Sequence, residues 1–184
     1  MSGKNAPEIL SADPAGLAEC VRRLLADEPV AVPTETVYGL AARADSATAV
    51  AAVYRAKGRP DFNPLIVHCR DLQHARALAH FDQRATLLAQ TFWPGPLTLV
   101  LPLERSGGLA AAVTAGLPTV ALRVPEHPVM RAILLRSGLA LAAPSANFSG
   151  GVSPTTARHV VESLGSRIAA VVDGGPSGRG LEST

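Results

Sequence analysis

The sequence predicts an α/β protein built on an open, twisted, mixed sheet with flanking helices. Strand-like apolar runs alternate with capped, amphipathic helical patterns along the whole chain, with roughly six of each. The runs around Leu97 and Val120 have no helix between them, so a purely parallel sheet is not expected. Internal repeats, coiled-coil heptads and low-complexity stretches are not found in the sequence.

Length and composition are those of one globular domain. The chain has 184 residues, of which 47% are hydrophobic and 17% charged, and this excludes a disordered protein. A net charge of +2 gives no global field for binding nucleic acid. Cys20 and Cys69 lie in apolar surroundings and are expected to be buried free thiols in a reducing compartment. With no apolar leader or run of membrane-spanning length, we expect a cytoplasmic protein without membrane contact.

The first half of the chain begins with a predicted helix over 13–27, capped by Asp13 with Pro14 in its first turn. The apolar face of this helix is expected to comprise Leu17, Cys20, Val21, Leu24 and Leu25. A short buried strand over 29–33 follows. The later elements are a helix over 45–58 closed by Gly58, a strand over 64–69, and helices over 71–79 and 82–92.

The second half continues the alternation. Helices are predicted over 127–138 and 153–165, the second with Ser153 as its cap and Pro154 at its first position. Strands are predicted over 93–103, 118–125, 139–147 and 167–175. In such sheets ligands gather where strands end and loops begin.

Polar residues are concentrated in four such places, at 33–40, 54–68, 142–154 and 173–184. In the second, Gly58 and Pro60 end a helix, so Lys57 and Arg59 can both turn toward one locus and bind a polyanion. A helix end that merely carries cations favoured by its dipole is an equal alternative. Ordinary strand ends and loops are the alternatives for the other three places, and a satisfied core histidine is the alternative for His68.

Several common sites are not supported by the sequence. It has no G-x-x-x-x-G-K-[ST] phosphate loop and no G-x-G-x-x-G dinucleotide motif after a strand. The five histidines show no H-E-x-x-H or Cys/His spacing, so no zinc or other dedicated protein-held metal is predicted.

The order of several segments resembles the YrdC/Sua5 family of threonylcarbamoyl-AMP synthases. These segments are "AVPTETVYGL", "AKGRP", "NPLIVH", "WPGPLT", "VTAGLPTVALRVPEHP", "APSANFSG" and "GLEST", with a K-x-R and an S-x-N motif among them. The resemblance implies a YrdC-like (DHBP synthase-like) domain that joins L-threonine, bicarbonate and ATP into threonylcarbamoyl-AMP and pyrophosphate. It further implies that a partner transferase uses the product for the N6-threonylcarbamoyl modification of adenosine 37 in tRNA.

The same resemblance implies roles for individual residues. Lys57 and Arg59 are expected to be catalytic, because they would neutralise the triphosphate. The ATP-binding residues implied are Lys57, Arg59, Asn63, Thr119, Ser145, Asn147 and Ser153. The threonine-binding residues implied are Thr36, His68, Arg123, Ala143 through its backbone, and Ser183. Mg²⁺ is expected with the triphosphate rather than on a carboxylate cluster of the protein.

The chain stops at "GLEST", whereas members of the family continue into a further strand, and longer members add a second domain. We therefore expect residues 1–184 to be a single catalytic domain that is truncated at its C-terminus. Three alternatives keep the fold and change the function: an RNA-binding module, a carbamoyl-transfer relative, and a paralogue without synthase activity.

Overall fold

The computed structural model describes residues 6–184, in which eight strands form one sheet. The strands are β1 (Glu8–Ser11), β2 (Val30–Val32), β3 (Gly39–Arg43), β4 (Ile66–His68), β5 (Leu99–Pro102), β6 (Thr119–Arg123), β7 (Leu141–Ala142) and β8 (Ala170–Asp173). The helices are α1 (Pro14–Leu25), α2 (Ala47–Lys57), α3 (Leu72–Arg76), α4 (Gln83–Phe92), α5 (Pro128–Ser137) and α6 (Ala157–Leu164). Three short 3₁₀ helices cover Arg105–Gly107, Ala111–Val113 and Gly165–Arg167.

The sheet is open and mixed, as predicted, with the strand order β1-β8-β2-β3-β7-β4-β6-β5. Strand β8 pairs in parallel with β1 and β2, and β4 pairs in parallel with β6. The remaining pairs, including β5 with β6, are antiparallel. The antiparallel β5–β6 pair confirms the expectation drawn from the missing helix between them.

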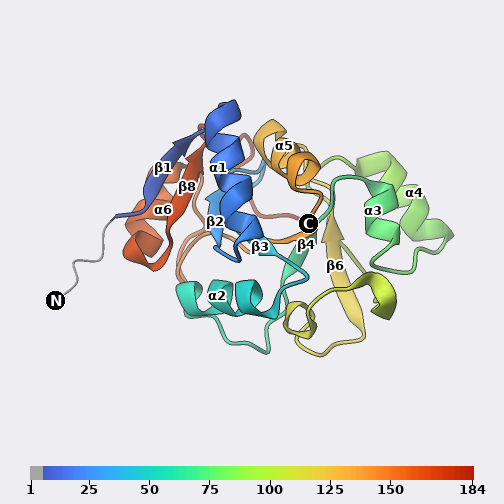
Figure 1. The fold of residues 1–184 in the computed structure, drawn as a ribbon. Coiled ribbons are helices and arrows are strands. Elements are labelled where there is room, and N and C mark those ends of the chain that lie inside the picture. Colours follow the sequence, from blue (N-terminus) through green and yellow to red (C-terminus); the bar gives the residue numbers. More distant parts are fainter. Residues whose placement is uncertain (1–5) are drawn as a thin grey trace.

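Helices cover both faces of this sheet (Figure 1). Strand residues alternate between two apolar clusters, as the period of two requires: Ala31 faces one cluster, whereas Val30 and Val32 face the other. Helices α2 and α6 pack into the first cluster, and α1 and α5 pack into the second. Cys20 and Cys69 are both buried in these clusters.

Most predicted helix ends are confirmed. The Asp13 carboxylate accepts from the backbone N–H groups of Ala15 and Gly16, and Gly58 closes α2 with φ of 58°. The last helix was predicted wrongly, because α6 begins at Ala157 with Thr156 as its cap. Ser153 lies before the start of this helix, and its hydroxyl donates to the Glu182 carboxylate instead.

Other details also differ from the sequence prediction. Strands β1 and β3 were not predicted; β1 is short and only Leu10 of its residues is buried, which leaves little alternation to detect. In α1, Leu25 is 50% exposed and so does not belong to the apolar face. Within residues 6–184 no helix is both long and apolar enough to cross a membrane.

The segment after β8 returns to the middle of the molecule, where the C-terminal end lies (Figure 1). Thr184 accepts a backbone hydrogen bond from Thr98 and donates one to the carbonyl of Pro96, over 2.9 and 3.2 Å. The Tyr38 hydroxyl donates to the carbonyl of Gly175 over 2.7 Å and fixes the start of this segment. These contacts hold the C-terminal segment across the central strands, next to the site described below.

Candidate functional site

A pocket of about 190 Å³ opens over the central strands of the sheet. Its walls come from the turn between β2 and β3, the segment 59–68, the end of β6, the turn after β7 and the C-terminal segment. The polar lining side chains are Thr34, Thr36, Arg59, His68, Arg123, Ser145, Glu182 and Ser183. Strand pairing brings these distant segments together, since His68 of β4 lies in register with Arg123 of β6.

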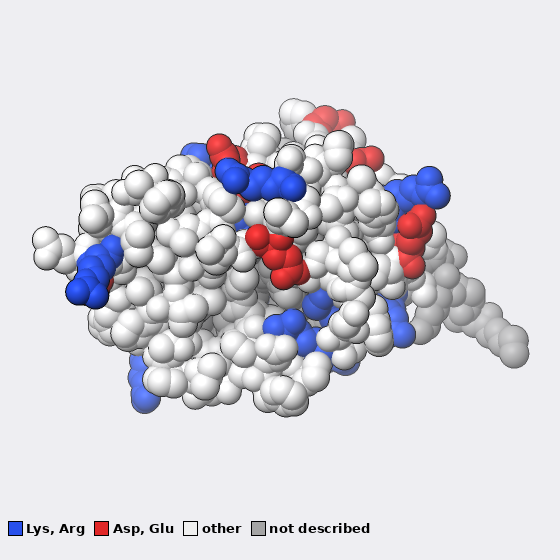
Figure 2. Space-filling model, turned by 180° about the vertical axis from the view of Figure 1, so that it is seen from behind, with Lys and Arg blue, Asp and Glu red and all other residues white. Residues whose placement is uncertain are grey.

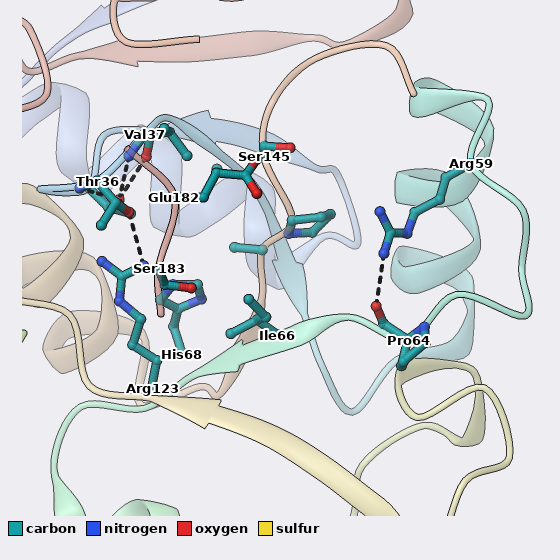
Figure 3. A pocket seen from close by; sticks show the side chains of 14 residues that line it. Thr36, Val37, Arg59, Pro64, Ile66, His68, Arg123, Ser145, Glu182 and Ser183 are labelled. Atoms are coloured by element: carbon teal, nitrogen blue, oxygen red, sulfur yellow. Dashed lines mark hydrogen bonds between the residues drawn. The ribbon is translucent and has the colours of Figure 1, made fainter. Parts of the chain in front are cut away.

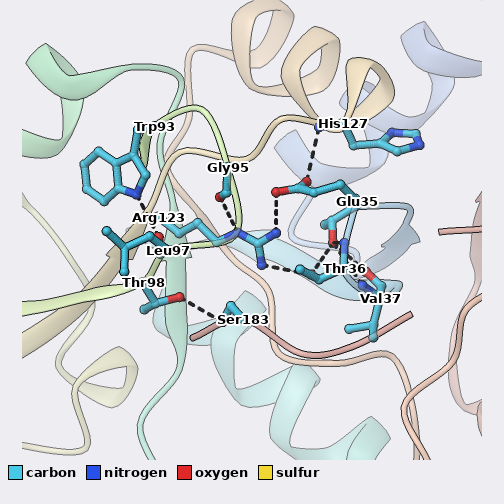
Figure 4. A network of polar contacts seen from close by, with 11 residues as sticks. Glu35, Thr36, Val37, Trp93, Gly95, Leu97, Thr98, Arg123, His127 and Ser183 are labelled. Carbon is cyan, nitrogen blue, oxygen red and sulfur yellow. Dashed lines mark hydrogen bonds and ion pairs between the residues drawn. The ribbon is translucent and has the colours of Figure 1, made fainter. Parts of the chain in front are cut away.

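One end of the pocket is built around the buried Arg123 (Figure 4). Its Nη2 pairs with Glu35 Oε1 over 2.6 Å, and its Nη1 donates to Thr36 Oγ1 over 3.0 Å. Nε donates to the carbonyl of Gly95 over 3.1 Å. The other oxygen of Glu35 accepts from the His127 backbone N–H over 3.2 Å. All three guanidinium nitrogens are thus oriented by the protein before any ligand binds.

Glu35 is ionised in this setting although its side chain is buried. Burial alone would raise the pKa of Glu35, but the charge of Arg123 and its hydrogen bond outweigh burial and hold that pKa below its ordinary value. The pair therefore presents a nearly neutral unit to the pocket, with guanidinium N–H groups fixed in direction.

His68 lies beside this pair, on the floor of the pocket (Figure 3). Burial lowers the pKa of His68 to about 3, and the charge of Arg123 adds to that effect. The imidazole is therefore neutral at physiological pH. Neither ring nitrogen has a side-chain partner in the part of the chain that the structure describes, so the ring can form a hydrogen bond with a ligand.

Arg59 lies at the end of the pocket opposite Arg123 (Figure 3). Its Nε donates to the carbonyl of Asn63 over 3.2 Å, and its Nη2 donates to that of Pro64 over 3.0 Å. Arg59 is half-buried and forms no ion pair with the residues that the structure describes. Its positive charge therefore remains available to an anionic ligand.

The C-terminal segment closes one side of the pocket. Ser183 accepts a hydrogen bond from the Thr98 hydroxyl over 2.8 Å, and Glu182 accepts one from the Ser153 hydroxyl. Both Glu182 and Ser183 line the cavity between its two arginine ends (Figure 3).

Comparison with known proteins gives consistent results. The Sua5/YciO/YrdC family model, described as telomere recombination, matches residues 22–184. A threonylcarbamoyl-AMP synthase of Bacillus subtilis is 51% identical over 176 residues, which are 95% of this chain and 51% of that protein. The chain belongs to the Sua5/YciO/YrdC family. A threonylcarbamoyl-AMP synthase of Pyrococcus abyssi is 47% identical over 156 residues, covering 84% of this chain and 45% of that protein.

A solved member of the family has the same fold. The crystal structure of P. abyssi Sua5 complexed with L-threonine matches with a TM-score of 0.92 and 41% identity, covering 96% of this chain and 53% of that one. The chain thus spans about half the length of the curated relatives named here.

The pocket brings together most of the residues that the family resemblance implied. All five residues expected to bind threonine line it, namely Thr36, His68, Arg123, Ala143 and Ser183. Of the residues expected to bind ATP, Arg59 and Ser145 line it. The two groups lie at opposite ends of one cavity, with Ser145 and Arg59 on the side away from Arg123 (Figure 3).

The other residues expected to bind ATP lie outside this lining. Asn63 is exposed, and its carbonyl accepts from Tyr54 and Arg59. Thr119 begins β6 and pairs with Pro102, while Ser153 contacts the C-terminal segment through Glu182. Lys57 and Asn147 are buried beneath the turn after β7. Direct contact of these five residues with ATP stays a prediction.

Two important residues were not assigned by the sequence. Glu35 orients Arg123, and Glu182 is a carboxylate in the pocket lining. Glu35 directly follows a predicted buried strand, and such a position is typical of ligand-binding residues. No motif or pattern near Glu182 indicates that it lines the pocket. Within residues 6–184 no cluster of three His, Cys, Asp or Glu side chains is arranged to hold a metal ion.

Charges on the face shown in Figure 2 are mixed. Lys and Arg side chains stand singly or in small groups, Asp and Glu side chains lie among them, and most of this face is uncharged around a central hollow. This face therefore lacks the continuous basic surface that is typical of nucleic-acid binding.

Proposed function

We propose that the chain is the catalytic domain of an L-threonylcarbamoyladenylate synthase, a nucleotidyltransferase. The observation that carries the proposal is one cavity with two chemically different ends. At one end Arg123 is fixed in direction and balanced by Glu35; at the other Arg59 has no carboxylate partner among the described residues. The first suits the carboxylate of an amino acid and the second suits a polyphosphate. The resemblance to P. abyssi Sua5, solved with L-threonine, supports the first assignment.

The proposed reaction has two steps. The neutral amine of threonine attacks bicarbonate, and loss of water gives the N-carboxylate. A carbamate oxygen then attacks the α-phosphorus of ATP, and the bond to pyrophosphate breaks. The protein contributes positioning and charge stabilisation, with Arg59 placed to offset negative charge on the phosphates. No covalent enzyme intermediate is needed.

The threonine end is proposed to work through fixed neutral and charged donors. Arg123 binds the carboxylate of threonine through its remaining N–H groups. His68 is neutral, so its ring can both donate and accept, and it can hydrogen-bond the hydroxyl or the neutral amine of the substrate. Thr36, Ser183 and the backbone of Ala143 complete this end. Ser145 and Arg59 serve the nucleotide, together with Asn63, Thr119 and Ser153 once ATP is bound.

Further partners belong to the same proposal. Mg²⁺ enters with the triphosphate, because the described residues offer it no cluster of their own. The product is passed to a threonylcarbamoyl transferase that modifies adenosine 37 of tRNA. A cytoplasmic location is proposed because the two free thiols, Cys20 and Cys69, fit a reducing compartment.

The test is mass-spectrometric detection of threonylcarbamoyl-AMP from this chain with ATP, L-threonine and bicarbonate, omitting each substrate in turn. Product is expected only when all three are present, together with one pyrophosphate per product. If a variant extended at its C-terminus also makes no product, the synthase proposal is wrong. Salt-sensitive tRNA binding that ignores ATP and threonine would then favour the RNA-binding alternative.

A further inference from the structure

The ammonium group of Lys57 is buried between the end of α2 and the turn after β7, which comprises residues 143–151. Its side chain is only 1% exposed, and Nζ donates to the carbonyls of Ser145 and Asn147, the latter over 2.7 Å. We propose that Lys57 is a positioning residue that holds this turn, and that it acts on ATP through Ser145 rather than by touching the phosphates. The proposal rests on the proposed function and assigns a different role to one residue of that site.

Lys57 faces the turn rather than the cavity. It is not part of the pocket lining, whereas Arg59, two residues later, and Ser145 are. Two of its three N–H bonds are directed at backbone carbonyls. Within residues 6–184 Lys57 makes no ion pair, so its buried charge is offset by the two carbonyl dipoles and by the charge of Glu182 at longer range.

The backbone of Lys57 holds the same turn from a second direction. Its carbonyl accepts from the Ser149 N–H over 2.8 Å, so side chain and main chain of one residue bind both halves of the turn. The next residue, Gly58, has φ of 58°, and a Cβ there would lie 2.7 Å from the ring of Phe148. The end of α2 and the turn are therefore fitted to each other closely enough to require a glycine.

Asn147 is the counterpart of Lys57 inside the turn. Its buried Nδ2 donates to the carbonyls of Phe148 and Gly151 over 2.9 and 2.8 Å. The K-x-R and S-x-N motifs therefore divide in the same way. Arg59 and Ser145 line the pocket, whereas Lys57 and Asn147 are buried outside its lining and shape the turn. Losing Lys57 would leave two buried carbonyls without a donor and release the side of the turn that carries Ser145.

The deciding experiment compares Lys57→Met with Arg59→Met as a matched control, without any ligand. Lys57→Met keeps the length and apolar stem of the side chain and removes its donors, whereas Arg59→Met changes the neighbouring cation of the motif. Amide hydrogen exchange is measured by NMR at Ser149, whose N–H is bound to the Lys57 carbonyl, and at Ala146, whose N–H is bound to Tyr38 over 2.7 Å.

In Lys57→Met we expect exchange at Ser149 and at Ala146 to be at least tenfold faster than in the wild type, with the central strands little changed. In Arg59→Met both sites should match the wild type. Wild-type protection at Ser149 in Lys57→Met would overturn the proposal. This measurement needs no turnover, so it stands even if the synthase proposal fails.

A second variant separates positioning from phosphate contact. Gly58→Ala displaces Phe148 and the turn while leaving the Lys57 ammonium in the protein. The proposal expects Gly58→Ala and Lys57→Met to show the same faster exchange at Ser149 and a similar loss of kcat. Gly58→Ala also tests the proposal if the Lys57→Met variant does not fold. Two results together would overturn the proposal and show that Lys57 binds the phosphates. Lys57→Met would weaken binding of inorganic triphosphate tenfold or more, and Gly58→Ala would loosen the turn yet retain the wild-type kcat.

Discussion

Two arginines lie at opposite ends of the pocket, and the protein prepares them differently. Arg123 is 3% exposed, paired with Glu35 and hydrogen-bonded through all three guanidinium nitrogens. Arg59 is half-buried and is held by two backbone carbonyls. The Arg123 end is therefore rigid and nearly neutral, whereas the Arg59 end carries an unbalanced positive charge.

This difference matches the two ligands that the site is proposed to hold. A small amino acid with one carboxylate gains most from donors fixed in direction, since its binding loses little entropy in the protein. A triphosphate carries several negative charges, so it gains most from cations that no carboxylate already neutralises. The same difference predicts that substitutions at the Arg123 end change stability and those at the Arg59 end do not.

The largest effect is expected for Arg123→Ala. Removing the guanidinium leaves the Glu35 carboxylate buried without a counter-charge, which should lower the free energy of unfolding by about 3–5 kcal/mol. Denaturation followed by circular dichroism measures this loss. In the folded fraction the threonine concentration needed for half-maximal rate should rise at least tenfold, with that for ATP nearly unchanged.

The control for this prediction is the double variant Glu35→Ala with Arg123→Ala. Once both partners are gone no buried charge is left unpaired, so the combined loss should be smaller than the sum of the single losses. Strictly additive losses would show that Glu35 and Arg123 do not act as a pair.

Arg59→Ala is expected to have the next largest effect, on binding alone. Loss of a charge-assisted contact to phosphate should weaken ATP binding by about 1.5–3 kcal/mol, roughly 10- to 150-fold. The free energy of unfolding should change by less than about 0.5 kcal/mol, because Arg59 is half-buried and bonded only to carbonyls. Titration calorimetry with a non-hydrolysable ATP analogue measures the first quantity. A stability loss as large as that of Arg123→Ala would remove the contrast between the two ends.

A smaller effect is expected from the pH dependence of His68. Its pKa of about 3 in the folded chain lies below its ordinary value of 6.5, so the unfolded chain binds more protons between these limits. The free energy of unfolding should therefore fall as pH falls, by about 1 kcal/mol between pH 7 and pH 5.5 from this residue. His68→Gln should show a correspondingly flatter curve in denaturant titrations across that range. Curves that run parallel would mean that His68 is not held neutral by burial.

Features that depend on neighbouring residues were predictable from the sequence. The Asp13 cap and the left-handed Gly58 follow from local backbone geometry. The antiparallel β5–β6 pair follows from a connection without a helix. The pocket residues Thr36, His68 and Arg123 were found through the family motifs rather than through any local pattern.

Features that depend on contacts between distant segments were not predictable. The Ser153 hydroxyl looks like a helix cap in sequence, yet it bonds to Glu182, 29 residues later. The Lys57 ammonium resembles a phosphate-binding group, yet its partners lie 88 and 90 residues away in a turn. In both cases the side chain has the right chemistry for the predicted role, and tertiary packing decides which partner it meets.

Ser183→Ala tests the segment that joins the two ends, and its effect should be the smallest. The variant loses the hydrogen bond from the Thr98 hydroxyl, but Thr184 keeps its backbone bonds to Pro96 and Thr98. We expect a stability loss of about 0.5 kcal/mol, because the half-buried hydroxyl of Thr98 can bond to water instead. The threonine concentration needed for half-maximal rate should rise about two- to fivefold.

The matched control is Ser177→Ala in the same segment. The Ser177 hydroxyl is buried and has no hydrogen-bond partner in the part of the chain that the structure describes, so its removal should leave stability and the threonine requirement unchanged or slightly improved. Steady-state rates at varied threonine and fixed ATP separate the two serines. Because only Ser183 lines the pocket, an equal rise in both variants would mean that the segment affects threonine through its general mobility. A rise confined to Ser183→Ala would instead assign that hydroxyl to the Arg123 end.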